Sequence, residues 1–157
     1  MQIVNFLCLP KRGEEIMDHS MYDPQVYQFG GGDRDEGHMG LLQYRTIDSH
    51  DPRAFLEPHP RIPNTNFFSY RNPGGWPQSR GGDSGGPIIR RRLSDDRFVL
   101  IGVHKGRNGS SLPRDSNRKF SYYTSVIHFL DDICKFSGIC PDGDYRKDKV
   151  HEVEVNG

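Results

Sequence analysis

Short runs of β-forming residues alternate along this chain with long connections rich in Gly, Pro, Asn and Asp. That alternation is typical of an antiparallel barrel or sandwich. The predicted strands are residues 2–9, 25–29, 41–47, 66–70, 87–91, 97–103 and 120–126. Six or seven short strands suit one small barrel. We therefore expect an all-β fold formed by one antiparallel β-barrel.

One helix is predicted near the end of the chain, over residues 125–136. Ser125 can cap its start, and Gly138 stands where a helix of this length would end. The apolar residues that recur at helical spacing are Ile127, Leu130, Ile133 and Cys134. We predict a single domain over residues 1–140, followed by a charged, solvated tail over residues 141–157.

Composition limits the function classes. The 157 residues have room for one ordinary domain. A mean hydropathy of −0.77 is low for a well-buried core, so we expect marginal stability. The 21 Lys and Arg balance 21 Asp and Glu, which implies no nucleic-acid partner. No run approaches the roughly 18 apolar residues of a membrane span, and no metal, nucleotide or cofactor motif stands out.

A glycine-rich loop at residues 81–87, Gly-Gly-Asp-Ser-Gly-Gly-Pro, holds a single serine, Ser84. A serine hydroxyl is a weak nucleophile until a base takes its proton, and its attack on a carbonyl creates an oxyanion that needs N–H donors. Glycines let the backbone turn so that such donors face the reacting carbon. The loop therefore predicts a nucleophile, and a glycine-rich turn with an incidental serine is the plainer alternative.

This seven-residue string resembles the active-site loop of the trypsin/chymotrypsin family of serine endopeptidases. Other segments similar to that family follow in the family's order, at residues 6–10, 26–32, 41–43, 101–106 and 122–126. They cover most of residues 5–140 and correspond to the second of the family's two barrels. The resemblance implies one chymotrypsin-type barrel, incomplete relative to the two-barrel fold. It also implies an endopeptidase that works through an acyl-enzyme, without a cofactor, on a peptide or protein substrate.

The resemblance also implies the role of each loop residue. Ser84 would be the nucleophile, and the backbone N–H groups of Gly82 and Ser84 would form the oxyanion hole. Asp83 would be structural, because its counterpart in the family pairs with the new amino terminus that zymogen cleavage frees.

Substrate-reading positions follow from the same resemblance. Gln78 falls at the floor of the primary specificity pocket, and its neutral amide lacks the carboxylate that would pair with Lys or Arg. A trypsin-like preference is therefore not expected. The strand that lines the pocket and hydrogen-bonds the substrate backbone would be Val103, His104, Lys105 and Gly106.

Several positions depart from the family's pattern. His104 and Lys105 replace a serine and a tryptophan, Arg80 replaces a cysteine, and Ser121 replaces a glycine of the pocket wall. We therefore expect a pocket of different shape. His104 would line this pocket or simply pack, because the family geometry points it away from the serine oxygen.

The segments that resemble the family do not include the general base or the acid that orients it, because in the family both residues come from the first barrel. The seven histidines are His19, His38, His50, His59, His104, His128 and His151, and none lies in the family's Ala-Ala-His-Cys context. We therefore expect little peptidase activity from this chain alone. It would be either the second half of an endopeptidase or a non-catalytic relative, a pseudoprotease that binds peptides or proteins.

The three cysteines make an odd count, and a disulfide between two of them requires an oxidising compartment. Cys134 and Cys140 are close enough in sequence to join the helix end to the following turn. The resemblance implies that Cys8 bridges to a segment upstream of this barrel, and a buried thiol is the alternative. Asn108 begins a glycosylation sequon. The family is secreted, whereas the start of this chain lacks the features of a signal peptide, so an N-terminal part is missing or the chain is not exported.

Residues 82–86 also satisfy the Gly-x-Ser-x-Gly elbow of α/β-hydrolases. That elbow passes directly into a helix. Here Pro87 is followed by the β-branched Ile88 and Ile89, which favour a strand. The elbow is therefore the least supported of the three hypotheses.

Overall fold

The computed structural model describes residues 7–31, 42–51, 56–58, 66–71, 82–107 and 120–141. Seven strands in these ranges form one sheet in the order β2-β1-β5-β6-β7-β4-β3, and every neighbouring pair is antiparallel. The strands are β1 (Tyr22–Gly30), β2 (Gln43–Asp48), β3 (Leu56–Pro58), β4 (Phe67–Arg71), β5 (Pro87–Arg92), β6 (Arg97–Arg107) and β7 (Phe120–Ser125). The predicted antiparallel β architecture is confirmed.

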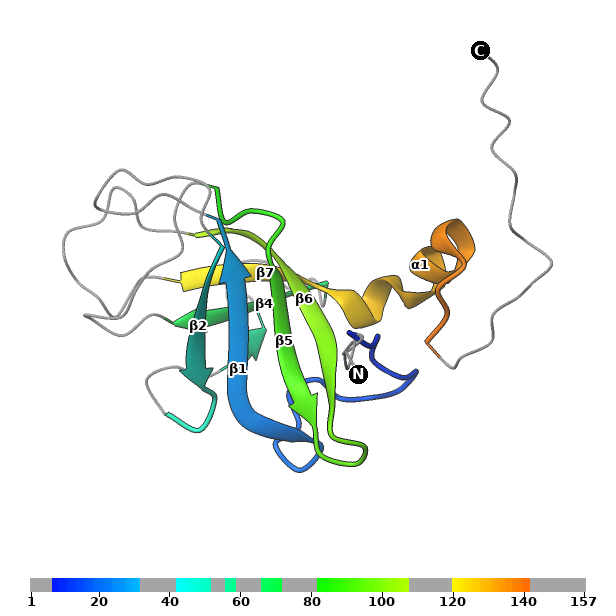
Figure 1. The fold of residues 1–157 in the computed structure, drawn as a ribbon, viewed down its shortest axis with the longest axis horizontal. Coiled ribbons are helices and arrows are strands. Elements are labelled where there is room, and N and C mark those ends of the chain that lie inside the picture. The colour runs from blue at the N-terminus through cyan, green and yellow to red at the C-terminus, as the bar shows by residue number, and fades with distance from the viewer. Residues whose placement is uncertain are drawn as a thin grey trace, which may run out of the picture.

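The sheet is a curled half-barrel. In Figure 1, strands β1, β5 and β6 form its near side, and β7 and β4 cross behind them. Among the described residues the two edge strands, β2 and β3, do not pair with each other. In the part of the chain that the structure describes, the expected barrel is thus a sheet that curls into a half-barrel.

The inner face of the curl carries the core. Alternate residues of each strand point inward, as in β5, where Ile88, Arg90 and Arg92 are buried. The buried apolar residues of this core are Ile16, Tyr22, Val26, Ile47, Phe68, Tyr70, Ile88, Val99, Ile101 and Tyr123. Their aromatic rings pack edge-on or stacked, as Phe68 and Tyr123 do with centroids 5.3 Å apart.

A β-bulge in β6 determines which of its side chains face inward. The register with β5 shifts between Ile88 and Ile89, so Ile88 pairs with Gly102 while Ile89 pairs with Leu100. Ile101 is the extra residue, and the inward positions change from Val99 and Ile101 to Gly102 and His104. The bulge therefore turns the His104 side chain into the core.

Two arginines are buried at the lower end of the curl. Arg90 is fully buried and donates hydrogen bonds to the main-chain oxygens of Ile16 (2.8 Å) and Asp23 (2.9 Å). Arg92 forms a buried ion pair with Glu14, 3.0 Å apart, and Glu14 also accepts a hydrogen bond from the Tyr22 hydroxyl at 2.8 Å. These contacts fasten the N-terminal segment to β1 and β5.

The last β-strand leads into a short helical region. Residues Val126–Phe129 form a 3-10 turn, and α1 (Leu130–Ser137) follows. Ser125 makes no capping hydrogen bond and belongs to β7, so its predicted capping role is wrong. Gly138 ends the helix as predicted, with a φ of 75° and its N–H bonded to the Cys134 oxygen. No helix among the described residues is long and apolar enough to cross a membrane.

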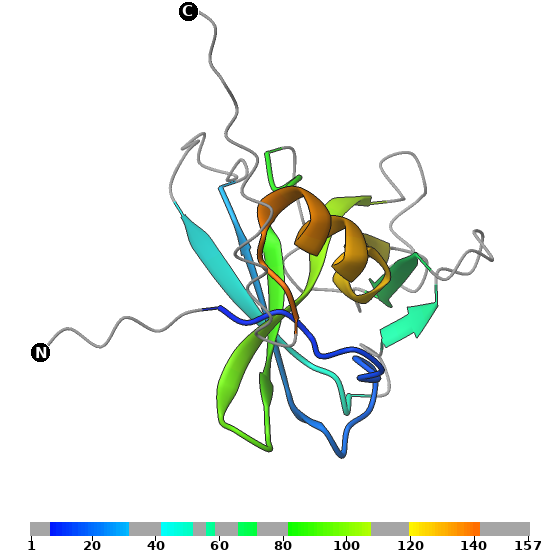
Figure 2. The same ribbon diagram turned by 90° about the vertical axis from the view of Figure 1, so that its right-hand side faces the viewer.

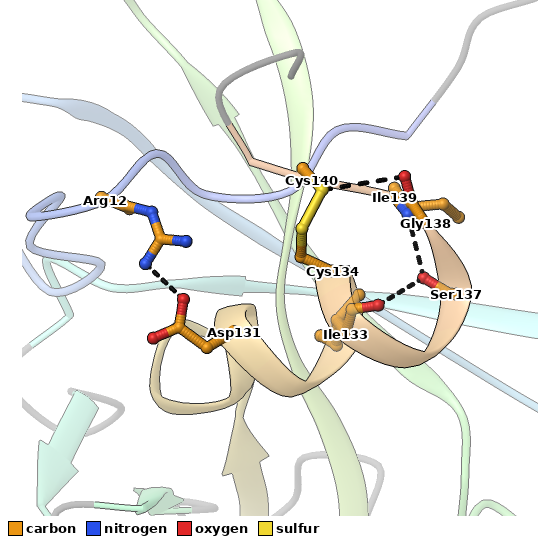
Figure 3. The surroundings of a disulfide bond; sticks show 8 residues. All are labelled: Arg12, Asp131, Ile133, Cys134, Ser137, Gly138, Ile139 and Cys140. Atoms are coloured by element: carbon orange, nitrogen blue, oxygen red, sulfur yellow. Dashed lines mark hydrogen bonds and ion pairs between the residues drawn. A yellow bond between two sulfur atoms is a disulfide. The ribbon is translucent and has the colours of Figure 1, made fainter. Parts of the chain in front are cut away.

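A disulfide between Cys134 and Cys140 joins the helix end to the turn that follows, which confirms the predicted pair (Figure 3). An ion pair between Arg12 and Asp131 links the N-terminal segment to α1, and Figure 2 shows that segment passing below the helix. The helix is thus fixed at both ends, once by a covalent bond and once by an exposed ion pair.

Several other predicted elements begin or end at different residues in the structure. Residues 2–6 of the strand expected at 2–9 lie outside the described residues, and Cys8 forms an isolated parallel bridge to Val99. β3 was not predicted, since a three-residue edge strand ending in Pro58 has no readable period. β6 continues past Val103 to Arg107 by pairing with β7, and the register of that pair shifts between His104 and Gly106. Residues 142–157 of the expected tail are outside the described ranges.

We predict that Glu14→Ala lowers the free energy of unfolding by about 1–3 kcal/mol, because it removes one of the two carboxylates that meet the buried Arg92 guanidinium, leaving Asp95, and takes away the acceptor of the buried Tyr22 hydroxyl. Glu15→Ala is the matched control, since Glu15 is exposed and should change stability by no more than about 0.5 kcal/mol. Urea denaturation measures both values. Equal effects of the two variants would show that the buried pair does not anchor the N-terminal segment.

Candidate nucleophile loop and interior polar cluster

The serine loop is a direct extension of the β5–β6 hairpin. The Gly85 N–H donates to the His104 oxygen at 2.8 Å, and the His104 N–H donates to the Gly86 oxygen at 2.9 Å. A third bond, from the Gly86 N–H to the Asp83 oxygen at 3.0 Å, closes the turn. Figure 1 shows the loop at the upper end of β5, beside the end of β1. The position of Ser84 is therefore fixed by β6.

Glycine conformation shapes the turn on both sides of Ser84. Gly82 has a φ of 94° and Gly85 a φ of 86°, values that other residues rarely adopt. Gly86 lies so close to β1 that a Cβ would collide with the Phe29 main-chain oxygen. Both features hold the loop against the end of β1.

Ser84 is exposed, and its hydroxyl donates a long hydrogen bond of 3.5 Å to the Lys105 oxygen. In the part of the chain that the structure describes, the backbone N–H groups of Gly82 and Ser84 form no hydrogen bond. The loop thus presents one hydroxyl and two N–H donors that a bound group can use.

Behind the loop lies a group of polar side chains that we call the interior polar cluster: Gln28, Arg45, His104, Ser121 and Tyr123. They come from β1, β2, β6 and β7, where Gln28 and Arg45 are directly paired in register. The Gln28 Oε1 accepts hydrogen bonds from Arg45 Nε at 2.8 Å and from the Tyr123 hydroxyl at 2.6 Å. Arg45 Nη2 lies 3.3 Å from the Tyr123 hydroxyl and 3.4 Å from Ser121 Oγ.

His104 is the member of this cluster whose polar atoms are not satisfied. Its side chain is 3% exposed, and neither ring nitrogen has a hydrogen-bond partner. The ring packs edge-on against Tyr123, with centroids 5.3 Å apart. Burial lowers the pKa of His104, and the Arg45 guanidinium lowers it further. The Asp83 carboxylate and the main-chain groups of Asp83 and Gly106 oppose this shift. The imidazole is therefore held neutral beside a cation.

The remaining predicted substrate residues lie along β6. Val103 is half-buried and pairs with Pro87, while Lys105 is exposed with its ammonium 4.7 Å from the centre of the Phe67 ring. Gly106 pairs with Tyr122. The predicted residues that lie outside the described ranges are Gln78, Arg80, Asn108, His38, His59 and His151.

No described histidine hydrogen-bonds to Ser84. His104 joins the loop through its backbone alone, and its ring faces the core. The rings of His19 and His50 are tilted by 59° with centroids 4.6 Å apart, and the Nδ1 of His19 lies 3.3 Å from Ser49 Oγ. His128 is exposed on the 3-10 turn. Within the described ranges, no cluster of three or more His, Cys, Asp or Glu could hold a metal ion.

Sequence reasoning missed Gln28 and Arg45. The available signal was their place in the strands: each stands two residues from a buried apolar residue, Val26 or Ile47, on the same face of its strand. Polar residues in core-facing positions point to a buried network.

The chain matches no model of a known protein family, and no curated protein matches it significantly. The chymotrypsin-type assignment of the half-barrel therefore depends on the serine loop and on the order of the similar segments. It enters below as a proposal.

Gly86→Ala should destabilise the chain by about 1–3 kcal/mol and displace the serine loop, because the added Cβ meets the Phe29 oxygen. Gly31→Ala is the matched control, since a Cβ there has no neighbour within 4 Å. Thermal unfolding and amide chemical shifts report the two effects. If Gly86→Ala proved as harmless as Gly31→Ala, the loop would not be packed on β1 as described.

The lowered pKa of His104 predicts a pH dependence of stability. Below about pH 6.5 the unfolded chain takes up a proton that the folded chain resists, so the free energy of unfolding falls as the pH falls. His104→Leu should remove this contribution. The pKa of His19 is also lowered by burial, but His19 is present in both proteins, so its contribution cancels in the comparison. Urea titrations between pH 7.5 and pH 5 test the difference. Parallel stability curves would mean that the buried imidazole takes up protons as it does in water.

Proposed function

We propose that this chain carries the nucleophile of a chymotrypsin-like serine endopeptidase, with Ser84 as the attacking group. The observation that supports this most is the exposed Ser84 hydroxyl on a turn fixed by β6, beside the N–H groups of Gly82 and Ser84. These are the parts that acyl transfer needs: an accessible hydroxyl and donors for the oxyanion.

The proposed reaction runs in two steps. Ser84 Oγ attacks the peptide carbonyl and gives its proton to a general base, while the carbonyl oxygen takes up negative charge between the loop N–H groups. The C–N bond then breaks, the amine leaves with the proton, and an acyl ester remains on Ser84. Water cleaves that ester in the same way. An imidazole would have to come from residues outside the described ranges or from another polypeptide.

The substrate would lie along β6. Strand β5 begins at Pro87, opposite Val103, so β6 continues past its neighbour on that side. An extended peptide could add to this edge beside Lys105 and Gly106, and main-chain hydrogen bonds would then bring its carbonyl to the loop. Asp83, close to Gly30, would fix the loop rather than react.

A peptide-binding module without catalysis is the second candidate. It is favoured by one observation: the Ser84 hydroxyl donates to the Lys105 oxygen, and no described histidine contacts it. The α/β-hydrolase elbow is no longer a candidate, because the residues after the loop form the strand β5 and not a helix.

An oxidising compartment is proposed with this function. The Cys134–Cys140 disulfide is weakly compatible with secretion. Cys8 is a free, partly buried thiol beside β6, and we propose it as the point of attachment for a first barrel.

Reaction with a fluorophosphonate probe tests the nucleophile. We expect Ser84 in the 157-residue chain to react about 10- to 100-fold faster than the exposed Ser20 and Ser94, because the loop N–H groups stabilise the oxyanion. Peptide mapping by mass spectrometry measures the three rates.

Ser84→Ala must abolish the fast adduct, and Ser94→Ala must leave it intact. Reaction of Ser84 as rapid as in an intact peptidase would show that this chain supplies its own base. A rate equal to that of Ser20 would overturn the proposed nucleophile and leave the binding module.

A further inference from the structure

The end of β6 next to the serine loop carries two exposed cations, Lys105 and Arg107. They alternate along the strand with the buried His104 and the half-buried Gly106, so both side chains lie on the outer face of the sheet. Residues two apart on a strand are separated by about 7 Å, close enough for both charges to act on one peptide. Neither cation forms an ion pair with a carboxylate of the described residues.

Lys105 is in direct contact with the proposed nucleophile. Its main-chain oxygen accepts the hydrogen bond that Ser84 Oγ donates at 3.5 Å. The residue before it, His104, bonds to Gly85 and Gly86 of the loop through its main chain, at 2.8 and 2.9 Å. A carbonyl attacked by Ser84 would therefore lie beside the main chain of Lys105, which makes Lys105 the cation of β6 nearest to the proposed reaction.

The ammonium group of Lys105 is held in place without being neutralised. It lies 4.7 Å from the centre of the Phe67 ring, and a cation–π contact of this kind restricts the side chain but leaves its charge intact. Because an ammonium has three donors, a carboxylate can bind to it while the ring contact persists. The acid of the serine loop does not take this place, since the Asp83 carboxylate lies against Gly30 of β1.

The main chain of β6 offers a second set of contacts at the same end of the strand. β5 reaches only as far as Val103, and beyond His104 no described strand covers this edge of β6. The Tyr122 hydroxyl donates to the Arg107 oxygen at 3.1 Å, which holds the last residue of the strand. All the paired strands of the sheet are antiparallel. A peptide added in the same sense would place the residues on the amino side of its scissile bond beside Arg107.

Charge determines which peptides suit this edge. Alternate side chains of an extended peptide would lie on the same face as Lys105 and Arg107. Basic side chains there would be repelled by both cations, whereas acidic side chains would be attracted. A nucleic acid would supply negative charge as well, but it would not pair with the strand edge as a peptide backbone does.

We propose that Lys105 and Arg107 bind acidic side chains on the amino side of the scissile bond, while the peptide backbone adds to the end of β6. This rests on the proposed function of Ser84, and it names the substrate class as an extended peptide that carries Asp or Glu at alternate positions. Lys105 is the main determinant, because its main chain contacts Ser84.

NMR titration of the 157-residue chain with acetyl-Ala-Glu-Ala-Glu-Ala-amide tests this, with Gln or Lys in place of both Glu residues for comparison. The Glu peptide should bind about fivefold more tightly than the isosteric Gln peptide at low salt, because it forms two exposed ion pairs. The Lys peptide should bind most weakly. The amide shifts should centre on Gly106 and Arg107.

Lys105→Met should reduce the preference for the Glu peptide to about twofold, because the variant loses one ion pair and keeps a side chain of similar length over Phe67. Lys105→Arg should restore it. Lys135→Met is the matched control: Lys135 is also exposed, and its ammonium lies 5.1 Å from the centre of the Phe136 ring on α1. This control should keep the full preference.

Equal affinities for the Glu and Gln peptides would overturn the inference, and so would an equal loss in Lys105→Met and Lys135→Met. Absence of binding by any of the peptides would overturn it as well. A thymidine oligonucleotide that bound as tightly as the Glu peptide would show a general anion surface and count against a peptide site.

The same titration with Ser84→Ala separates this inference from the proposed function. A Lys105-dependent preference in that variant, together with unreactive Ser84 in the native chain, would retain the acidic-peptide site and reject the nucleophile. A reactive Ser84 with no preference for the Glu peptide would do the reverse.

Discussion

Two backbone hydrogen bonds between the serine loop and β6 support everything else proposed for this chain. Gly85 donates to the His104 oxygen, and His104 donates to the Gly86 oxygen. Through them a turn that is otherwise exposed takes its position from the central hairpin of the sheet. The same residue of β6 places its ring behind the loop, so one strand fixes both the reacting group and the chemistry of the surroundings.

The core of the half-barrel contains buried polar and charged side chains, and these fall into two groups. Arg90 and Arg92 are fully or nearly fully buried, and main-chain oxygens or the Glu14 carboxylate meet their donors. His104 is equally buried and meets none. The hydrogen-bonded guanidinium groups of Arg90 and Arg92 hold the N-terminal segment in place through Ile16 and Glu14.

The sequence predicted the strands that have a clear period, the serine loop and the disulfide. Alternation sufficed for β1, β5 and β7, and six-residue spacing sufficed for Cys134 and Cys140. The sequence alone could not predict the bulge at Ile101, because the change of register arises from the pairing of β6 with β5. Without the bulge, the inward turn of His104 cannot be foreseen. The Arg45–Gln28 contact likewise depends on the β1–β2 register, which local propensity does not set.

The central claim is that the loop around Ser84 is built to receive an oxyanion, and phenylboronic acid tests it most directly because the acid forms a tetrahedral anion on a serine oxygen. In ¹⁵N–¹H spectra, the amides of Gly82 and Ser84 should shift downfield and become protected from exchange as a boronate adduct forms. The same amides should not respond in Ser84→Ala. If a boron adduct formed on Ser84 and left both amides unchanged, the loop would hold no oxyanion site and the account would be contradicted.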